Sequence, residues 1–587
     1  MIDVGTIPPA ALIGWALLPT LFASRKAGYA SAMVGCTLVV LWAVIVPEGL
    51  GLTASFVGFE LRLVDIDSVS RFMLLIFGGF GVAAVGYAYG AGARRDILLA
   101  AIVYVSAAVW TVSVGDWLAL VVGWELMAIA STVLLWQHGG KAIRAGYRYA
   151  LAHALGGGLL VAGVLLHLET VGVSSTALHF DGTGISAGLP AATVGLGVGV
   201  NAAVIGLHGW LPDSYHRPHV ATSVFLCAYT TKTAVYAAYR TFPDGNLVLA
   251  YAGGAMAIYG AAYALAQKDM RRLLAYHIQA QVGYMLAGIG IGSALGVAGG
   301  FGHLFNNILY KGLLFMVAGS LVLGTGENRL DRFGGIGRSA PVLFGLFLVA
   351  ALSITAVPGF NGFVSKGMVL DAAGDAGETP LRWLLLVGAV GTFASFSKFG
   401  YYAFLQGERE RIPSLPASHR LVMIPIAALC ILLGVGYQLQ FTLLPATGEW
   451  ATDPYSSGHV IEAGGLAMGG ILTFVIGKPV FDRLHGGVDV NRIHDPLVFY
   501  GTRSVSSLVA RSFGAIDAWV RVLAWHGVRL VRNPAGTIEL LLPVSAHQWY
   551  ERRRDRIPGE TGFKASLDES LYLIVIILIV LLTVAHL

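Results

Sequence analysis

A carboxylate and a lysine stand inside long apolar runs of this sequence, where an ionisable side chain needs a reason to be. Glu125 lies near the centre of the apolar run from Trp117 to Trp136, in the stretch VVGWELMAIASTV. Lys232 lies deep in another apolar run, in the stretch TTKTAVYAAYR. An ionisable group at the centre of a bilayer costs roughly 2.5–3.5 kcal/mol, so it is seldom kept without a partner or a function. Buried acids and bases can pass protons, and the two residues are therefore candidates for proton transfer.

A second polar group is arranged at helical spacing. His303, Asn307 and Lys311, in GHLFNNILYKGLLF, are four residues apart and so share one helix face. Lys366, in NGFVSKGMVL, follows a helix break, and His277, in LLAYHIQAQVGYM, lies in the cytoplasmic third of its apolar run. Together with Glu125 and Lys232 these residues could form a chain of proton carriers.

Several of these residues also have a purely structural interpretation. His277 and His303 fit core histidines whose nitrogens are satisfied, and Asn307 fits an amide that joins neighbouring helices. Lys366 and, with more reason, Lys398 fit lysines that extend to the membrane interface.

Three residues lie too deep to reach the interface: Glu125, Lys232 and Lys311. Burying three such groups costs on the order of 8–10 kcal/mol, which is comparable to the whole stability of a domain. A structural Glu–Lys pair remains an alternative, but this cost favours a proton relay.

Composition gives the class of protein. The chain has 587 residues, of which 56% are hydrophobic and 12% charged, against about 25% charged residues in a soluble domain. Its 77 glycines fit close helix packing in lipid. The net charge of +5 comes from Lys and Arg dispersed among short loops, which is an orientation signal rather than a nucleic-acid surface. The sequence therefore predicts an all-α polytopic membrane protein.

No cofactor or metal is predicted. Cys36, Cys227 and Cys430 lie singly in apolar runs, so they cannot form a zinc, iron–sulfur or disulfide framework. The sequence contains no GxGxxG, P-loop or HExxH motif.

About sixteen apolar runs predict transmembrane helices. Basic loops alternate with acidic loops along the chain, which places the first loop in the cytoplasm and both termini outside. The expected spans are residues 8–22, 28–46, 70–90, 97–114, 116–136, 148–168, 190–210, 219–239, 247–266, 271–291, 300–322, 340–370, 382–405, 419–438, 464–478 and 568–586.

Two of these spans are broken by proline. Pro212 ends the seventh in LHGWLPDSY, and Pro358 and Gly359 interrupt the twelfth in SITAVPGFNGF. The breaks are five spans apart and so fall on opposite orientations, which is the mark of an inverted repeat. Spans four to eight are therefore expected to match spans nine to thirteen.

This pattern divides the chain into six parts. We expect three N-terminal helices in 1–96, the first repeat in 97–240, the second in 241–405 and two further helices in 406–478. The segment 479–567 contains SLVARSFGAIDAWVRVLAWHGVRLV, whose helical apolar spacing predicts amphipathic helices on the cytoplasmic face. They either extend laterally or pack on their own bundle. The run 568–587 would be an anchor helix.

Several motifs in a fixed order carry a resemblance to a known family. GWELM, HGWLPDSY, TKTAVYAAYR, AQKDMRRLLAYHIQAQVGYM, YKGLLF and VPGFNGFVSK resemble the antiporter-like subunits of respiratory complex I, membrane-bound hydrogenases and Mrp-type Na+/H+ antiporters. The D-type Mrp subunit is the most similar of these, and the resemblance covers about residues 60–405. It implies a fourteen-helix core of two inverted five-helix repeats, with a lateral helix in some members.

The resemblance also implies roles for residues. Glu125, Lys232, Lys311 and Lys366 match the family's proton-carrying glutamate and lysines, and His303 matches a histidine of some members. One position departs: where the family has a lysine that pairs with the glutamate, this chain has Asn201, in GVNAAVIGLHGWLPD. An amide cannot carry a proton as a charged relay member, so the first half-channel is expected to be altered or silent.

The sequence thus predicts a proton-translocating subunit of an Mrp-type cation/proton antiporter in the cell membrane. Its partners would be other hydrophobic subunits, including antiporter-like paralogues, with protons and Na+ as candidate ions. A membrane-arm subunit of a complex I-like or hydrogenase-type complex, the membrane subunit of an energy-coupled inorganic carbon transporter, and a scaffold with inactive half-channels remain open. Asn201 is the best support for the scaffold.

Overall fold

The computed structural model describes residues 4–407, 415–445, 448–483 and 491–532, and it is mostly helical. It divides into two units, residues 1–494 and 495–587, which are considered separately. The elements in chain order are η1 (Val4–Thr6), α1 (Ala11–Gly14), α2 (Leu17–Phe22), α3 (Arg25–Ile45), β1 (Gly49–Phe56), β2 (Phe59–Ile66), α4 (Ser68–Gly90), α5 (Arg95–Ser113), α6 (Trp117–Trp136), α7 (Lys141–Val171), η2 (Thr176–Leu178), α8 (Leu189–Asn201), α9 (Trp210–Ser214), α10 (Val220–Leu226), α11 (Thr230–Thr241), α12 (Leu247–Leu265), α13 (Met270–Ile291), α14 (Ala294–Thr325), η3 (Leu330–Arg332), α15 (Ile336–Ser339), α16 (Pro341–Ile354), α17 (Asn361–Asp375), α18 (Thr379–Gly400), η4 (Tyr401–Leu405), α19 (Ala417–Val435), α20 (Tyr437–Leu443), α21 (Ser457–Arg483) and α22 (Asn491–Arg532).

The polytopic helical membrane fold is confirmed. Among the described residues, ten helices are long and apolar enough to cross a membrane, and three shorter apolar helices accompany them: residues 11–22, α8 and α16. Helices occupy every expected span from 8–22 to 464–478. The last expected span, 568–586, lies outside the described residues.

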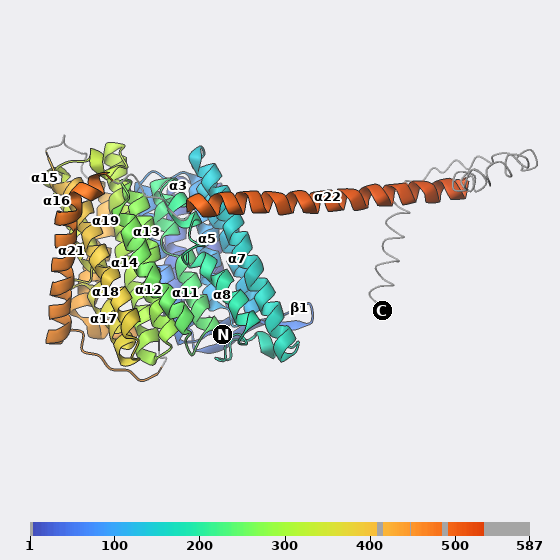
Figure 1. Ribbon diagram of the computed structural model, residues 1–587, viewed down its shortest axis with the longest axis horizontal. Coiled ribbons are helices and arrows are strands. Elements are labelled where there is room, and N and C mark those ends of the chain that lie inside the picture. The colour runs from blue at the N-terminus through green and yellow to red at the C-terminus, as the bar shows by residue number, and fades with distance from the viewer. Residues whose placement is uncertain (1–3, 408–414, 446–447, 484–490, 533–587) are drawn as a thin grey trace, which may run out of the picture. The chain divides into compact units, whose positions relative to one another are not determined.

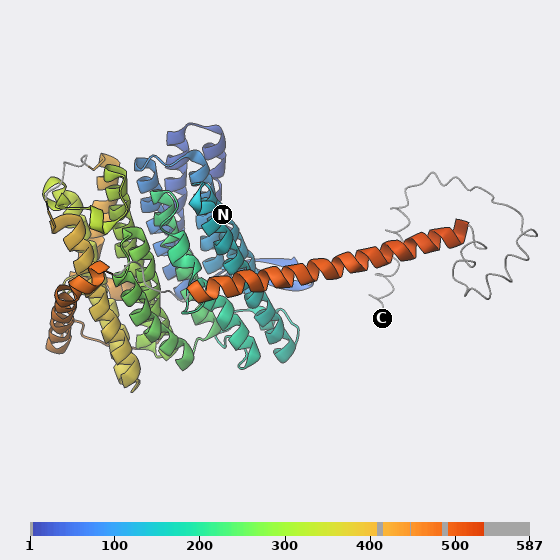
Figure 2. The same cartoon turned by 45° about the horizontal axis from the view of Figure 1, so that its top comes forward.

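The helices of the two repeats lie side by side (Figures 1 and 2). The first repeat, in cyan and green, is next to the second, in green and yellow. Gln279 on α13 joins the two, because its Nε2 donates to the carbonyl of Ala203, 3.1 Å away. Large apolar side chains such as Val122, Leu126 and Ile129 on α6 are exposed, as expected for a surface that faces lipid.

A β-hairpin is the element that an all-α prediction missed. Strands β1 and β2 pair antiparallel, and Phe56 faces Phe59 across the two-residue turn Val57-Gly58. Both turn residues have positive φ, 48° and 82°, which suits the right-handed twist of a tight hairpin. The chain between α3 and α4 is therefore an ordered hairpin rather than a loop.

The two repeats match residue by residue at an offset of 153. Helices α6 and α7 begin at Trp117 and Lys141, and α13 and α14 begin at Met270 and Ala294. The residues before α6 and α13, Asp116 and Asp269, both accept a backbone N–H three residues ahead, which satisfies one of the free donors at a helix start.

The matching breaks have the same backbone. Ala203 and Gly206 after α8 have φ of 58° and 89°, and Ala356 and Gly359 after α16 have φ of 63° and 93°. Each helix ends with the same hydrogen bonds: Val204 N reaches Gly199 O at 2.9 Å, and Val357 N reaches Leu352 O at 3.0 Å. This is the helix ending in which a left-handed residue satisfies the last carbonyls. Alanine takes the left-handed position in both halves, although glycine is usual there.

A further break was not expected. Span eight is divided into α10 and α11 by Cys227, Ala228 and Tyr229. The break occurs without proline, and it frees the carbonyl of Cys227 just before Lys232.

In the second unit the structure describes only part of one helix. α22 has 42 residues, about 63 Å at 1.5 Å per residue. Its described apolar side chains, including Phe513, Ile516, Trp519 and Leu523, are exposed. The helical part of the amphipathic prediction is confirmed. Its membrane face stays a prediction, and residues 533–567 lie outside the described residues.

Candidate functional site

A hydrogen-bonded cluster lies between α13, α14 and α17 in the second repeat. His303 is fully buried. Its Nδ1 lies 3.1 Å from Ser365 Oγ, and its Nε2 lies 3.1 Å from Gln281 Oε1. Tyr310 Oη lies 3.2 Å from the same Nε2 and accepts a hydrogen bond from Asn307 Nδ2 at 3.3 Å. The predicted residues His303 and Asn307 are thus linked through Tyr310, which was not among the predicted residues.

Lys366 lies at one end of this cluster. Its Nζ donates to the carbonyl of Ile354 at 2.8 Å, the last residue of α16, which the break leaves without a helical partner. The same ammonium lies 4.7 Å from the centroid of the Tyr284 ring, and Tyr284 contacts the ring of His303. The helix break therefore provides the binding place for Lys366, and the lysine does not extend to the interface.

Lys311 lies at the other end, next to Tyr310 in sequence. It is fully buried, and no atom of the described residues accepts a hydrogen bond from its Nζ. Its Nζ lies over the Phe396 ring, 5.8 Å from the ring centroid. The ring of His277 also lies beside Phe396, with 4.8 Å between the two centroids. His277 and Lys311 thus contact the same ring without bonding to each other.

Lys232 lies at the unexpected break of span eight. Its Nζ donates to the freed carbonyl of Cys227 at 2.9 Å and to Thr231 Oγ1 at 3.3 Å. The arrangement repeats what Lys366 does at the α16–α17 break: a buried ammonium binds the carbonyl that a broken helix leaves open.

The three lysines form one electrostatic group. Lys311 lies close enough to Lys232 and Lys366 for their charges to interact. Among the described Asp and Glu residues, none pairs with any of the three. Without a counter-charge, mutual repulsion disfavours a proton on all three at once, and a proton that arrives at one site weakens proton binding at the next.

Lys398 corrects one expectation. It is buried inside the protein and does not extend to the interface. Its Nζ donates to the carbonyls of Leu265 and Gln267 at 2.6 and 2.8 Å, at the end of α12. A cation at a helix C-terminus stabilises the exposed carbonyls there, which gives Lys398 a structural role.

Glu125 lies apart from the lysines. Its carboxylate rests on α7 at Gly157, where an added methyl group would come within 1.5 Å of Glu125 Oε1. It is half-buried beside the exposed Val122, Leu126 and Ile129. Within the described part of the chain it has no hydrogen bond or ion pair. The alternative of a structural Glu–Lys pair at Glu125 is therefore wrong for this structure.

Asn201 has a partner that was not predicted. It is fully buried at the end of α8, and its Oδ1 lies 2.7 Å from Nδ1 of His153 on α7. His153 is also fully buried, with its ring against Tyr149 and Trp210. The single polar residue in LAHALGGG was a signal for His153, but only the packing of α7 on α8 pairs it with Asn201.

A chain of hydroxyl groups leads from His153 toward Lys232. The ring centroids of His153 and Tyr149 are 4.1 Å apart. Tyr149 Oη lies 3.3 Å from Thr230 Oγ1, which lies 2.7 Å from Tyr104 Oη. Thr230 is the first residue of α11, one position before the Thr231 that binds Lys232. Hydroxyl groups thus lie next to His153 and next to Thr231, with ring packing rather than a hydrogen bond between His153 and Tyr149.

Asp213 lies after the first break, on α9, and forms ion pairs there. It accepts hydrogen bonds from Arg148 on α7 and from Arg217, whose guanidinium is 2.6 Å away. Burial raises the pKa of this carboxyl, but Arg217 and Arg148 outweigh burial and hold the pKa below its usual range. Asp213 therefore stays ionised, and it ties the segment around Pro212 to α7.

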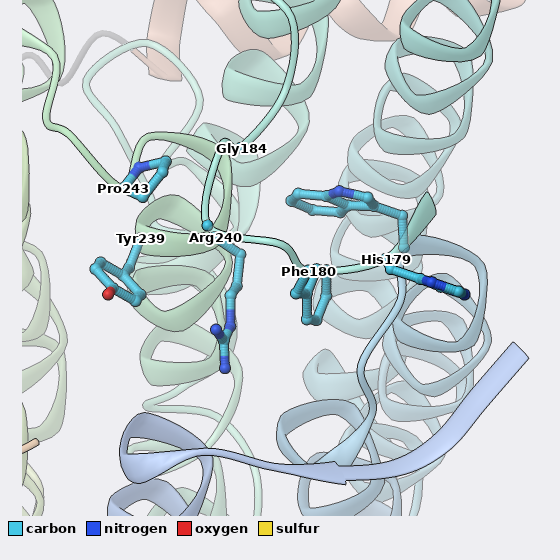
Figure 3. A pocket seen from close by; sticks show the side chains of 8 residues that line it. His179, Phe180, Gly184, Tyr239, Arg240 and Pro243 are labelled. Atoms are coloured by element: carbon cyan, nitrogen blue, oxygen red, sulfur yellow. The ribbon is translucent and has the colours of Figure 1, made fainter. Parts of the chain in front are cut away.

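A small cavity near the start of α6 contains none of the predicted carriers. It has about 30 Å³ of space for water, and it is lined by Trp117, His179, Phe180, Gly182, Gly184, Tyr239, Arg240 and Pro243. Figure 3 shows Arg240 beside Phe180. Its guanidinium binds Asp67 at 2.7 Å, which neutralises it. No group of three or more His, Cys, Asp or Glu in the described residues could hold a metal ion.

Comparison with known proteins agrees with this architecture. Residues 114–395 match the family described as "NADH:quinone oxidoreductase/Mrp antiporter, TM". The N-type subunit of the NADH-quinone oxidoreductase of Desulforudis audaxviator is 30% identical over 63% of this chain and 80% of its own length. The chain belongs to this family of membrane subunits.

Other members support the family assignment. The D-type subunit of the Na(+)/H(+) antiporter of Alkalihalophilus pseudofirmus is 30% identical over 58% of this chain and 72% of its own length. A chain of the Mrp complex from Dietzia sp. DQ12-45-1b has the same fold, with a TM-score of 0.76 and 22% identity over 89% of this chain; this chain spans 63% of that chain's length. The family's members in solved structures are subunits of multi-subunit membrane complexes.

Proposed function

We propose that this chain is a proton-translocating subunit of a multi-subunit Mrp-type cation/proton antiporter. The observation that carries the proposal is the group of three buried lysines, Lys232, Lys311 and Lys366, which interact electrostatically and have no acidic partner among the described residues. Keeping one buried ammonium costs several kcal/mol, and attraction to a carboxylate is the usual compensation. A structure without that compensation fits groups that exchange protons better than groups that hold a fold together.

In this proposal protons move along a polar path at mid-membrane. Lys366 and Lys311 exchange protons through His303, Tyr310 and Asn307, which already bond to one another. Lys232 joins this half to the first half. Glu125 has a different position: half-buried at the surface of α6, it can exchange protons with a neighbouring subunit. His277, whose ring lies beside Phe396 as Lys311 does, is a further candidate member of the path.

The antiporter assignment rests on the D-type relatives, whose names state this activity. A second candidate is a membrane-arm subunit of a complex I-like oxidoreductase, favoured by the match to the N-type relative. Both use the same residues, and they differ in what supplies energy. The exchanged cation, which we take to be Na+, and a location in the cell membrane belong to the first candidate.

The experiment has two arms. A tagged chain is isolated in mild detergent and its companions are identified by mass spectrometry. Antiporter-like paralogues and small hydrophobic subunits without redox proteins would support the antiporter, and companions with flavin or iron–sulfur clusters would support the second candidate.

The isolated complex is then reconstituted into vesicles, and proton flux is compared for wild type, Glu125→Gln and Lys366→Ala. Loss of flux in both variants supports the relay. Flux that survives in both contradicts it, and a wild-type complex that moves no protons under either driving force would favour the scaffold.

A further inference from the structure

The first half of the path has a gap in its proton carriers. Glu125 lies against α7 at Gly157, on the same helix face as His153 and Tyr149. Tyr149 Oη lies 3.3 Å from Thr230 Oγ1, two residues before Lys232. Asn201, at the break after α8, cannot take up a proton. His153 is the group in contact with Asn201 whose side chain can gain and lose a proton.

Three polar groups lie along two successive turns of α7. Asn201 Oδ1 lies where a methyl group on Gly156 would come within 3.1 Å, and Glu125 Oε1 lies where a methyl group on Gly157 would come within 1.5 Å. His153 precedes these glycines by three and four residues, so it lies on the same face one turn away. The absence of side chains at Gly156 and Gly157 is what lets Glu125 and Asn201 approach the helix beside His153.

The hydrogen bond to Asn201 defines the state of the ring. An amide oxygen only accepts, so Nδ1 of His153 must carry the hydrogen in this bond. Nε2 then holds the lone pair. It is buried, and no atom of the described residues forms a hydrogen bond with it.

A purely structural histidine would look different. His167, on the same helix, has both nitrogens bonded, to Ser186 Oγ at 2.7 Å and to the carbonyl of Ala177 at 3.0 Å. An unbonded buried nitrogen costs about 1–3 kcal/mol. His153 has this cost and His167 does not, which points to a use for the free nitrogen.

We propose that His153 carries protons in the first half, because Asn201 cannot take up a proton. This inference rests on the proposed proton-transfer function. Nε2 of neutral His153 takes up a proton from the side of Glu125 and forms an imidazolium. The same nitrogen then releases the proton toward the Tyr149–Thr230 hydroxyl chain, and the ring returns to its neutral form. Asn201 holds the Nδ1 hydrogen throughout and is a positioning residue.

The test compares variants of the full complex in vesicles, after confirming that each assembles as wild type does. His153→Gln keeps an amide group that can bond to Asn201 but cannot carry charge, and His167→Gln is its control on the same helix. We expect proton flux to fall at least about 10-fold in His153→Gln and to stay within about twofold of wild type in His167→Gln. Asn201→Ala, which frees the ring, is expected to reduce flux about 3-fold.

A rescue separates a carrier from a structural residue. The double variant His153→Gln/Asn201→Lys restores a protonatable group at the same turn, so flux is expected to return to within about 3-fold of wild type. Its pH dependence should move to more alkaline pH, because an amine ordinarily titrates about four units above an imidazole. A structural defect at His153 would not be repaired by a lysine on another helix.

Each other outcome overturns the inference. His153→Gln that transports at more than half the wild-type rate excludes a carrier, and a double variant that stays inactive assigns His153 a structural role. If Glu125→Gln and Lys366→Ala lose flux while His153→Gln keeps it, the proposed function stands and this inference fails. If wild type moves no protons, both fail.

Discussion

In the second half of the core, His303, Gln281, Ser365 and Tyr310 bond to one another and connect the neighbourhoods of Lys311 and Lys366. In the first half, beside a break with the same backbone, Glu125 has no partner among the described residues and His153 has an unbonded nitrogen. The contrast shows that the repeated backbone sets where polar groups can stand, and that each half fills those places differently.

The difference has a consequence for how each half could work. A connected network holds its groups in position before a proton arrives, and this reduces the reorganisation that transfer requires. Unpartnered groups such as Glu125 can change partner when a neighbouring subunit or a side-chain rotation brings one. We therefore expect the second half to tolerate the loss of charge least, and the first half to be the more adjustable.

The largest expected effect is at Lys311. Lys311→Met removes the charge and leaves no acceptor unbonded, because Nζ has no hydrogen bond in the described structure. Proton flux in vesicles should fall at least about 100-fold while the thermal unfolding midpoint stays the same or rises, since a buried charge without a partner destabilises the fold.

Lys398→Met is the matched control for Lys311→Met. It leaves the carbonyls of Leu265 and Gln267 without a donor. We expect the unfolding midpoint to fall by about 5 °C with measurable flux remaining. If instead Lys311→Met lowers the unfolding midpoint and Lys398→Met abolishes flux, Lys311 has the structural role and Lys398 the role in proton transfer.

A smaller effect is expected in the first half, at the glycine that accommodates Glu125. In Gly157→Ala the added methyl group would meet Glu125 Oε1 at 1.5 Å, so the carboxylate must turn away. We expect about a 10-fold loss of flux. Gly158→Ala is the control, because no atom lies within 4 Å of its added methyl group. Equal flux in the two variants would show that the position of Glu125 on α7 has no role.

Tyr310→Phe tests whether the connected network matters beyond its lysines. The change removes the hydroxyl group that joins Asn307 to His303, and we expect about a 5-fold loss of flux. Tyr87→Phe, which removes a buried hydroxyl bonded to the carbonyl of Met316 away from the path, should cost about 1 kcal/mol of stability and leave flux unchanged. A loss of flux in Tyr87→Phe as large as in Tyr310→Phe would attribute both to packing.

The smallest effects should be the same in both halves. Ala203→Gly and Ala356→Gly change residues with positive φ. Glycine relieves the backbone strain there, which stabilises the protein, but it also removes a methyl group and gives the unfolded chain more freedom, which destabilises it. These effects nearly cancel. Each should change the free energy of unfolding by less than about 1 kcal/mol. Ala202→Gly, at φ −76°, has no strain to relieve and should be the most destabilising of the three. Unequal results at Ala203 and Ala356 would break the equivalence of the two backbones.

Much of the fold could be predicted from sequence because lipid imposes simple rules. Spans follow from the length of apolar runs, and the break at Pro358 was visible as a residue that cannot continue a helix. The first break was expected at Pro212 but begins after Asn201, and Pro212 itself lies in α9. The hairpin was missed because its strands are short and lie between spans. The break before Lys232 was missed because Cys227, Ala228 and Tyr229 carry no helix-breaking signal, and tertiary packing decides the backbone there.

The residues of the candidate site could be predicted from sequence, but their contacts could not. Residue type and depth alone selected Glu125, Lys232, Lys311 and Lys366, since a buried charge is costly wherever the helix lies. Which groups meet is a property of the assembled bundle: the freed carbonyl that binds Lys366, the carbonyls that bind Lys398, and the pairing of His153 with Asn201.

Hydropathy and the cost of burial act on each segment independently, and this is why the amino-acid order alone specifies a membrane protein of repeated helices with ionisable residues at mid-depth. Three features emerged only from the packed helices. Among the described residues, Glu125 is unpaired and the three lysines have no acidic partner. The third feature is that His153 lies beside Asn201. Hydrogen bonds and charge pairing depend on distances of a few ångströms between segments far apart in the chain, and those distances are fixed only when the helices pack.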